Sequence, residues 1–364
     1  MKTYLNKTIK TIVSALFIMP ILVSCKGDGK VLSIGKPEFI REFPKTIQLK
    51  EIDGFNCNEI GFRDLKVVDS LLIISKADTW SVYSLDGSKK YGECMRVGNG
   101  PGEFADIPLP SRCHFFTEND SMFVHAADTY KGLVWEFNIS DILSGNSRIP
   151  HSVVETNLIQ DAMPAIVYGK DKILVYQYNH NYTNVQRMLY EGDTLRQMPV
   201  TKGIDGITLS GQADMNILSR GTCYNAAADK FVEAMTFLNQ MNIISGDGIE
   251  GKTICVGKKL DDIEILEKKS LLEFEACYIT ALAWEDGFGA VYFGFNYMAP
   301  DNKDKGIQIQ FFDWEGNPKC LVELPYYTDS FDIDFTNNIM YVVDSQNDKL
   351  IAYDATEIVK CLKS

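Results

Sequence analysis

The strongest constraint on the fold is a pattern of paired apolar runs that recurs along the chain. In each pair, a polar turn leads into a short run of β-branched or aromatic residues, a loop follows, and a second such run ends near Asp, Gly or Asn. These features are the signals of β-hairpins. The six pairs are DSLLIIS and VYSLDGS (69–75, 82–88), DSMFVHA and VWEFNIS (120–126, 134–140), DKILVYQ and RMLYEGD (171–177, 187–193), DKFVEAM and MNIISGDG (229–235, 241–248), GAVYFGF and IQFFDWEGN (289–295, 309–317), and NNIMYVV and LIAYDAT (337–343, 350–356).

Each pair is flanked by two further extended stretches. One precedes the pair, as GFRDLKVV precedes the first, and one follows it, as QMPV follows the third and EIVKCL the last. Four strands per unit, recurring every ~50 to 60 residues, are typical of a β-propeller blade. The sequence therefore predicts an all-β fold, a six-bladed β-propeller with four antiparallel strands per blade.

The apolar residues on both faces of such a sheet favour a closed ring. A single blade cannot bury both faces, so blades must stack on one another, and closure removes the two exposed end faces. We assign residues 46–364 to one propeller, in which the stretch TIQLKEI (46–52) is expected to pair with the last unit and fasten the ring. The alternative is a β-sandwich with a smaller all-β domain, which accounts less well for six matched units.

The first 25 residues have the order of a bacterial export signal. Basic residues at positions 2, 7 and 10 precede an apolar run over residues 12–23, which is too short to span a bilayer. The run leads into LVSC, which ends at Cys25 and resembles the lipobox of bacterial lipoproteins, whose cysteine becomes N-terminal and carries lipid. The alternative is an ordinary secretory signal with a chance cysteine.

This segment predicts how the protein is located. Residues 1–24 are interpreted as a lipoprotein signal peptide, Cys25 as the lipidation site, and residues 25–45 as the lipidated cysteine with a flexible spacer. No later segment contains enough consecutive apolar residues to span a membrane. We therefore expect the protein to associate with a membrane through its N-terminal lipid. We expect a lipid-anchored protein of the cell envelope, at the outer membrane, on its periplasmic or surface face.

Charge and cysteine content exclude some classes of function. The formal net charge is -13, and a chain this acidic is a poor nucleic-acid binder because phosphate neutralisation needs clustered Lys and Arg. Apart from Cys25, the remaining cysteines are scattered singly in mostly apolar contexts, which favours buried free thiols although export permits disulfides. No two Cys or His have zinc-ligand spacing, so neither a metal nor another cofactor is predicted.

A glycine-rich loop, RVGNGPGEF (96–104), suggests a phosphate cradle at first sight. A P-loop needs Lys and Ser or Thr after its last glycine, whereas here an acid follows, which would repel phosphate. A conformational role is favoured: the glycines permit positive φ, the proline fixes one turn position, and the aromatic ring can fill the space between blades. A ligand-facing loop is the alternative. The residues concerned are Gly98, Gly100, Pro101, Gly102, Glu103 and Phe104.

Together these features resemble a known family, the bacterial lipoproteins with a six-bladed β-propeller of the TolB-like and NHL-like kind. The resemblance rests on the lipobox at Cys25, on the six blade-like units, and on GNGPGEF (98–104), which is similar to the G-x-G-P-G-E-[FY] stretch that follows the outer strand of the first blade there. It implies the propeller fold and an envelope location over essentially the whole mature chain, and it implies no particular ligand.

Propellers normally bind ligands at one mouth of the central channel, near the ends of the innermost strands. Two arginines among carboxylate, Tyr and Asn side chains would suit a polar or anionic small molecule, a peptide, a glycan or an envelope protein. The alternative is that these groups pair across the channel and simply fill it. The candidates are Arg63, Asp64, Arg112, His114, Tyr224, Asn225, Tyr278 and Asp332.

The sequence contains no recognisable catalytic set. It has no G-x-S-x-G nucleophile elbow, no H-E-x-x-H zinc motif and no dinucleotide-binding fingerprint. We therefore expect a non-catalytic scaffold that binds a ligand or a protein. The alternative is an NHL-like propeller enzyme, a lyase or hydrolase with an axial metal, which would need several channel-facing His or carboxylate groups at one level.

Overall fold

The structure is a computed structural model, and it describes residues 30–57, 59–128, 130–145, 150, 152–155, 162–211, 213–296, 298–299, 302 and 305–364. Residues Val31–Ser364 form one compact unit. The expected signal peptide, Cys25 and the first residues of the expected spacer lie outside the described residues.

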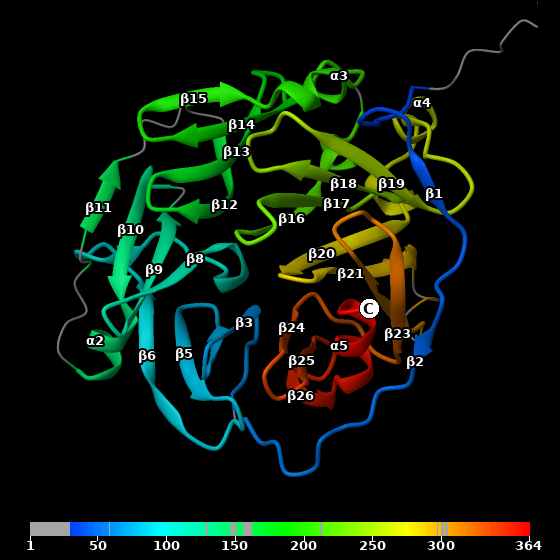
Figure 1. The fold of residues 1–364 in the computed structure, drawn as a ribbon. Coiled ribbons are helices and arrows are strands. Elements are labelled where there is room, and N and C mark those ends of the chain that lie inside the picture. Colours follow the sequence, from blue (N-terminus) through cyan, green and yellow to red (C-terminus); the bar gives the residue numbers. More distant parts are fainter. Residues whose placement is uncertain are drawn as a thin grey trace, which may run out of the picture. The chain divides into compact units, whose positions relative to one another are not determined.

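The described residues form six small sheets arranged as a β-propeller, which confirms the predicted all-β fold (Figure 1). Within each sheet the chain runs from the innermost strand outward. The first three sheets contain β3 (Asp64–Val68), β4 (Leu71–Ser75), β5 (Thr79–Ser84), β6 (Lys90–Val97) and β7 (Glu103–Phe104); β8 (His114–Glu118), β9 (Ser121–Asp128), β10 (Leu133–Asn138) and β11 (Ser152–Glu155); and β12 (Ala162–Gly169), β13 (Lys172–Tyr178), β14 (Val185–Glu191) and β15 (Thr194–Gln197).

The other three sheets also take strands from the N-terminal part of the chain. They contain β16 (Arg220–Asn225), β17 (Lys230–Met235), β18 (Gln240–Ser245), β19 (Gly251–Val256) and β1 (Glu38–Ile40); β20 (Ala276–Trp284), β21 (Gly287–Phe295), β22 (Ile307–Phe312), β23 (Pro318–Leu324) and β2 (Thr46–Ile47); and β24 (Phe331–Asp334), β25 (Ile339–Asp344) and β26 (Lys349–Asp354). The sheets are called blades 1 to 6 in chain order.

Short helices lie between the strands. In the part of the chain that the structure describes, no helix is long and apolar enough to cross a membrane. The helices are α2 (Ile139–Leu143), α3 (Lys202–Asp205), α4 (Ile263–Leu266) and α5 (Thr356–Leu362), with 3-10 turns η1 (Pro110–Arg112), η2 (Pro199–Thr201), η3 (Met215–Leu218) and η4 (Leu271–Glu273).

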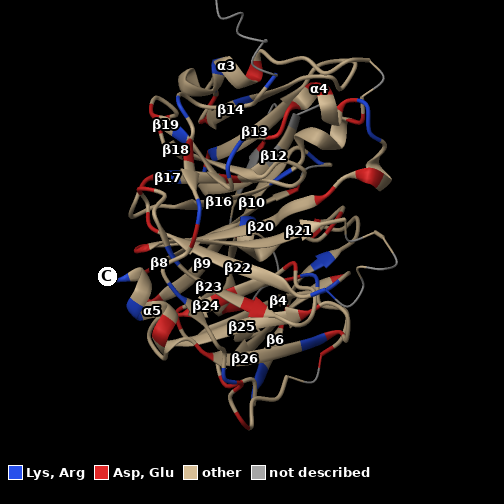
Figure 2. Ribbon diagram, turned by 90° about the vertical axis from the view of Figure 1, so that its right-hand side faces the viewer, with Lys and Arg blue, Asp and Glu red and all other residues tan. Residues whose placement is uncertain are grey.

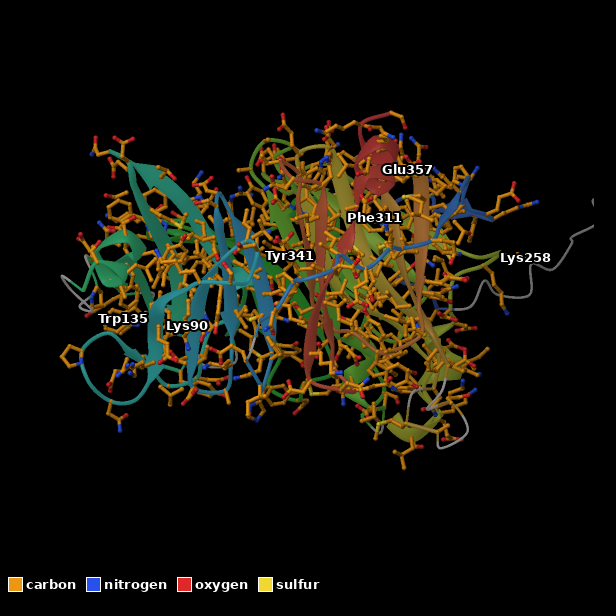
Figure 3. All side chains as sticks on the ribbon, turned by 90° about the horizontal axis from the view of Figure 1, so that it is seen from below. Lys90, Trp135, Lys258, Phe311, Tyr341 and Glu357 are labelled. Atoms are coloured by element: carbon orange, nitrogen blue, oxygen red, sulfur yellow. The ribbon has the colours of Figure 1, made fainter. Side chains whose placement is uncertain are left out.

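The core lies between the blades. Across the described residues, buried apolar side chains form six clusters, and each cluster joins two consecutive blades. The cluster between blades 6 and 1 contains Tyr341 of β25 and Leu72 of β4, and the Tyr341 hydroxyl donates to the carbonyl oxygen of Leu85 at 2.7 Å. Figure 3 labels Tyr341 and also Phe311, which belongs to the cluster between blades 5 and 6. The cluster between blades 6 and 1 closes the ring.

Residues 31–52, which we call the N-terminal strap, follow the outer edges of blades 4, 5 and 6 (Figure 1). Strand β1 pairs in parallel with β19, and β2 pairs in parallel with β23. Glu51 then forms an antiparallel bridge to Tyr353 of β26, flanked by hydrogen bonds from Ile52 N to Ala352 O and from Asp354 N to Lys50 O, each 2.9 Å. The strap therefore spans the closing half of the ring before the chain enters blade 1.

This arrangement refines two expectations about the N-terminal region. The stretch 46–52 does reach the last blade through Glu51, but its first residues pair with blade 5. Part of the spacer expected over residues 25–45 is ordered, because Leu32 and Ile34 are buried between blades 3 and 4 and Ile34 N donates to Thr253 Oγ1 at 2.8 Å.

The stretch EIVKCL was expected to be the fourth strand of the last blade, and that assignment is wrong. It lies in α5. The edge of β26 is already occupied by the strap, so no strand position remains. The helix instead buries Ile358, Val359 and Leu362, which helical spacing places on one side, against the cluster between blades 5 and 6. QMPV likewise leaves its strand, because its proline cannot donate to a ladder and starts η2.

The glycine-rich loop joins blades 1 and 2. Phe104 is fully buried, with its ring centroid 5.8 Å from that of Phe137 in blade 2. Gly98 N donates to Phe104 O at 2.9 Å, and Gly100 N donates to the Glu103 carboxylate at 2.6 Å. The loop thus folds around the carboxylate of its own acid, which leaves that acid no role in holding phosphate.

The glycines of this loop serve two different needs. Of the three loop glycines only Gly102 has a positive φ, +75°, so the positive φ that glycine permits is used at one of these positions. A Cβ at Gly98 would lie 2.0 Å from Glu103 Oε2, and one at Gly100 would lie 3.0 Å from it. These two positions need glycine because the carboxylate occupies the space of a side chain.

Replacing Ile47 by alanine tests the contribution of the strap. Ile47 is 6% exposed and packs between blades 5 and 6, whereas its neighbour Thr46 is exposed. We expect Ile47→Ala to lower the free energy of unfolding by about 2–4 kcal/mol, and Thr46→Ala to leave it within about 0.5 kcal/mol, measured by urea denaturation. Equal small effects would mean that the strap adds no stability to the ring.

The packing of the glycine loop can be tested with a double-mutant cycle. Gly98→Ala should lower the free energy of unfolding by about 1–2 kcal/mol, because the new methyl group displaces the Glu103 carboxylate from its hydrogen bond. In a chain that already carries Glu103→Ala, the same change should cost clearly less. Equal costs in the two backgrounds would show that the carboxylate is not what excludes a side chain at position 98.

Candidate ligand-binding site at one mouth of the channel

The first strands of the blades lie nearest the centre of the ring (Figure 1). A cavity of about 340 Å³, which we call the channel, is lined by residues from β3, β8, β12, β16 and β20. Because every blade repeats the same strand order, the starts of the first strands lie at one mouth of the channel. Side chains at these starts are therefore brought together although they are far apart in sequence.

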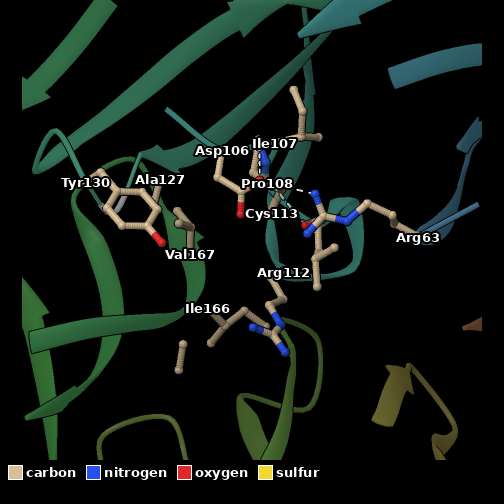
Figure 4. A pocket seen from close by; sticks show the side chains of 12 residues that line it. Arg63, Asp106, Ile107, Pro108, Arg112, Cys113, Ala127, Tyr130, Ile166 and Val167 are labelled. Atoms are coloured by element: carbon tan, nitrogen blue, oxygen red, sulfur yellow. Dashed lines mark hydrogen bonds and ion pairs between the residues drawn. The ribbon is translucent and has the colours of Figure 1, made fainter. Parts of the chain in front are cut away.

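An arginine lies at this position in three of the blades. Arg63 directly precedes β3, Arg112 ends the turn before β8, and Arg220 starts β16. Arg63 and Arg112 line a pocket of about 220 Å³, with Tyr130 on the opposite wall (Figure 4). Arg112 and Arg220 line a second pocket of about 160 Å³, which shares Arg112 and Ala165 with the first. We call Arg63, Arg112 and Arg220 the arginine mouth.

Two of these guanidinium groups are accessible. Arg63 donates to Asp106 at 3.1 Å, in a pair whose side chains are 39% and 53% exposed, so this ion pair contributes little to stability. Arg112 is also exposed, and its side chain has no hydrogen bond or ion pair with any described residue. Figure 4 shows both groups at the pocket.

Arg220 is the most constrained of the three. Its guanidinium carbon lies 3.9 Å from the centroid of the Tyr176 ring, a cation–π contact. Its two terminal nitrogens are buried and have no hydrogen-bond partner among the described residues. None of the described residues that line the second pocket is acidic. Buried donors without acceptors are costly, so this wall is suited to an anion.

A buried polar network holds Tyr176 in place beneath Arg220. The Tyr176 hydroxyl donates to Glu233 Oε1 at 2.8 Å, and Arg187 Nε lies 2.7 Å from both Glu233 oxygens. Arg187 Nη1 also donates to Asp205 at 2.6 Å. Burial acts to raise the pKa of Glu233, but the attraction of Arg187 and Arg220 outweighs it, and the pKa is lowered. Glu233 is thus ionised and already bonded, which leaves the Arg220 donors for another acceptor.

The two predicted aspartates, Asp64 and Asp332, are buried and form hydrogen bonds between blade 1 and blade 6. Asp64 accepts from Ser330 Oγ at 2.8 Å and from Ser111 N at 2.9 Å. Asp332 accepts from Val67 N and from Trp284 Nε1, both at 2.8 Å. Protein donors occupy the acceptor oxygens of both carboxylates. These two residues therefore fit the alternative given above, in which the candidate polar side chains pair with one another rather than bind a ligand.

The remaining predicted residues are distributed over the channel and the core. His114, Tyr224 and Asn225 line the central cavity, with Tyr224 and Asn225 at the end of β16 away from Arg220. Tyr278 is fully buried between blades 4 and 5, and its hydroxyl donates to Gln310 at 3.1 Å. The structure therefore brings Arg63 and Arg112 together at one mouth of the channel. It places His114, Tyr224 and Asn225 along the channel and encloses Tyr278 in the core.

Arg220 was missed in the sequence. The signal was present, because Ser219-Arg220 stands before the fourth unit as Ser111-Arg112 stands before the second. Aligning the residues that precede each repeated unit identifies Arg220 as the counterpart of Arg112. Its stacking on Tyr176 had no such signal, since Tyr176 belongs to the neighbouring blade.

The described residues include no group of three or more His, Cys, Asp or Glu side chains arranged to hold a metal ion. An axial metal would need such a group. The cysteines in the described part of the chain are free thiols, most of them buried: Cys57, Cys94, Cys113, Cys223, Cys255, Cys277, Cys320 and Cys361.

Comparison with known proteins supports the fold and does not assign a family. No protein-family model matches the sequence, and no curated protein sequence matches it. A crystal structure of a DUF4221 family member from Bacteroides vulgatus is similar with a TM-score of 0.53 and 9% identity, over 86% of this chain and 97% of that one. Raptor from Chaetomium thermophilum is similar with a TM-score of 0.49 and 10% identity, over 85% of this chain and 29% of that one. A putative exported protein from Bacteroides fragilis is similar with a TM-score of 0.44 and 11% identity, over 87% of this chain and 97% of that one. At these identities the likeness extends to the propeller fold alone.

Proposed function

We propose that this protein is a non-catalytic binding propeller that takes a small anionic ligand at the arginine mouth. The observation that carries the proposal is the Arg220 guanidinium, whose terminal nitrogens are buried in a pocket wall without a hydrogen-bond partner among the described residues. A carboxylate or phosphate oxygen placed there would accept from donors that are already fixed in position. Such pre-organised, charge-assisted hydrogen bonds are strong.

The negative charge of the rest of the chain favours binding of an anion at the arginine mouth over binding elsewhere on the surface. The chain has a formal net charge of -13, and charged residues lie mostly in loops and at strand ends (Figure 2). An anion is therefore repelled by the surface in general and attracted where Arg63, Arg112 and Arg220 converge. The two adjoining pockets give room for a small molecule rather than for a folded partner.

We further propose that the propeller is tethered to the cell envelope by lipid at Cys25. The support is the order of basic residues, apolar run and LVSC in the first 25 residues. The chain enters the propeller through the strap, whose strand β1 pairs with β19 at the outer edge of blade 4. The protein would then act as an envelope binding protein.

Binding of anions tests the arginine mouth directly. Citrate and inorganic phosphate should bind the propeller in isothermal titration, and Arg220→Met should weaken the better of the two by about 10- to 100-fold, because its charge-assisted hydrogen bonds are lost. Arg196→Met is the matched control, since Arg196 is a partly exposed arginine on the outermost strand of blade 3. An equal loss in both variants, or no anion binding at all, would contradict the proposed site.

Replacing Cys25 by serine tests the tether. Serine cannot form the thioether that carries the lipid, so the variant should move from the detergent phase to the aqueous phase when expressing cells are extracted with Triton X-114. Cys57→Ser removes a free thiol of the propeller and should leave the partition unchanged. Continued partition of the Cys25 variant into detergent would rule out lipid at this residue.

A further inference from the structure

Blade 2 contains a row of polar side chains that runs from the channel to its outer edge. The strand register places His114 of β8 opposite His125 of β9, His125 opposite Glu136 of β10, and Glu136 opposite Ser152 of β11. We call these four residues the histidine ladder. Each member lies on a different strand, so the ladder crosses the whole width of the blade.

Continuous contacts connect the ladder. His114 Nδ1 lies 3.1 Å from His125 Nδ1, and His125 Nε2 lies 2.7 Å from Glu136 Oε2. Ser152 Oγ donates to the other Glu136 oxygen at 3.1 Å. His125 is 4% exposed and Glu136 is 8% exposed, so this polar chain is enclosed by protein along most of its length.

The contacts determine where the hydrogens lie. An ionised carboxylate only accepts, so His125 must carry its hydrogen on Nε2, facing Glu136. A neutral imidazole carries one N–H, which makes His125 Nδ1 an acceptor. His114 Nδ1 must then be the donor, and the lone pair of His114 is left on Nε2.

This lone pair is available to the channel. His114 lines the cavity of about 340 Å³, and its Nε2 has no hydrogen-bond partner among the described residues. Burial, together with the neighbouring His125, lowers the pKa of His114 to about 4. The ring is therefore neutral across the physiological range, and the ladder presents it to the channel as an acceptor.

The cavity adjoins the arginine mouth. Cys113 lines both the channel cavity and the pocket between Arg63 and Arg112. The aromatic residues Phe115, Tyr168 and Tyr224 also line the cavity, and aromatic rings can pack on the apolar C–H face of a saturated ring. At about 340 Å³ the cavity is near the lower limit of small-molecule sites, so it suits a molecule of one or two rings.

We propose that the ligand is a hydroxylated anion, an acidic saccharide of one or two units, whose anionic group is held by the arginine mouth and one of whose hydroxyls donates to His114 Nε2. This inference rests on the proposed function and names its ligand class. Hydroxyl groups are the donors that match a neutral acceptor in this cavity, and a carboxylate or phosphate on the same small ring would lie toward Arg63 and Arg112, whose pocket shares Cys113 with the cavity. The channel would thus recognise both the anionic group and a hydroxyl group of one molecule.

The hydrogen positions can be tested without any ligand. In a protein labelled with ¹⁵N-histidine, long-range ¹H–¹⁵N spectra distinguish the two tautomers, and His114→Phe assigns the signals. We expect His114 to carry its hydrogen on Nδ1 and His125 on Nε2, with both rings neutral at pH 7. A hydrogen on Nε2 of His114 would overturn the proposal, because that ring would then offer a donor to the channel.

Four probes separate charge from hydroxyl recognition. Glucuronate and glucose 6-phosphate have both features, cyclohexanecarboxylate has a charged six-membered ring without hydroxyls, and glucose has hydroxyls without charge. We expect at least one of the two acidic sugars to bind about tenfold more tightly than cyclohexanecarboxylate and glucose, as the loss of one hydrogen bond or of the ion pair requires. The better of the two identifies the anionic group as carboxylate or phosphate.

The outcomes distinguish the two proposals. Equal binding of glucuronate and cyclohexanecarboxylate, both weakened by Arg220→Met, would overturn the saccharide and leave the anion site standing. Tighter binding of a short acidic peptide than of either acidic sugar would overturn it in the same way. Binding of glucose alone would instead remove the arginine mouth as the basis of the function.

Variants of the ladder complete the test. His114→Phe keeps a flat ring and should weaken binding of the better acidic sugar about tenfold, while leaving cyclohexanecarboxylate unchanged. His180→Phe is the control, because His180 is an exposed histidine outside the channel lining. An equal loss for both probes in the His114 variant would assign His114 a purely structural role and overturn the proposal.

Discussion

Face-to-face packing of sheets with two apolar faces is the interaction on which the rest of this structure depends. Each blade buries one face against the preceding blade and one against the next, and six interblade clusters of described residues share this task. Such packing is stable only if the first and last blades also meet. The cluster that contains Tyr341 and Leu72 supplies that closure from within, and the strap reinforces it from outside.

Closure also creates the candidate site. A ring of repeated blades brings the starts of all first strands to one mouth, so single side chains from distant parts of the sequence become neighbours. Arg63, Arg112 and Arg220 converge there without any local motif. Stacking on Tyr176 holds the Arg220 guanidinium in place, which reduces the entropic cost of binding a ligand there.

The buried polar groups fall into two kinds, and the difference separates scaffold from site. Asp64, Asp332 and Glu233 have acceptors occupied by donors from neighbouring strands and blades, so they fasten the ring. Arg220 and His114 belong to the lining of cavities, and the Arg220 terminal nitrogens and His114 Nε2 have no hydrogen-bond partner among the described residues. A protein that encloses polar groups normally satisfies them, because an unmet hydrogen bond in a dry interior is costly. Unmet buried atoms also occur in Trp135, Asn239 and Gln240, but among these residues only Arg220 lines a pocket at the arginine mouth, and we therefore propose it as the anchor of a ligand.

Local sequence determined the repeated hairpins and hence the number of blades, because alternating apolar runs and turn residues act over a few positions. It also indicated Arg63 and Arg112, which stand at recognisable unit starts. Tertiary structure decided the rest. It assigned the edges of blades 4, 5 and 6 to the strap, which turned EIVKCL into a helix. It also set Arg220 on Tyr176 and aligned His114 with His125 and Glu136, since such contacts depend on strand register and on neighbouring blades rather than on nearby sequence.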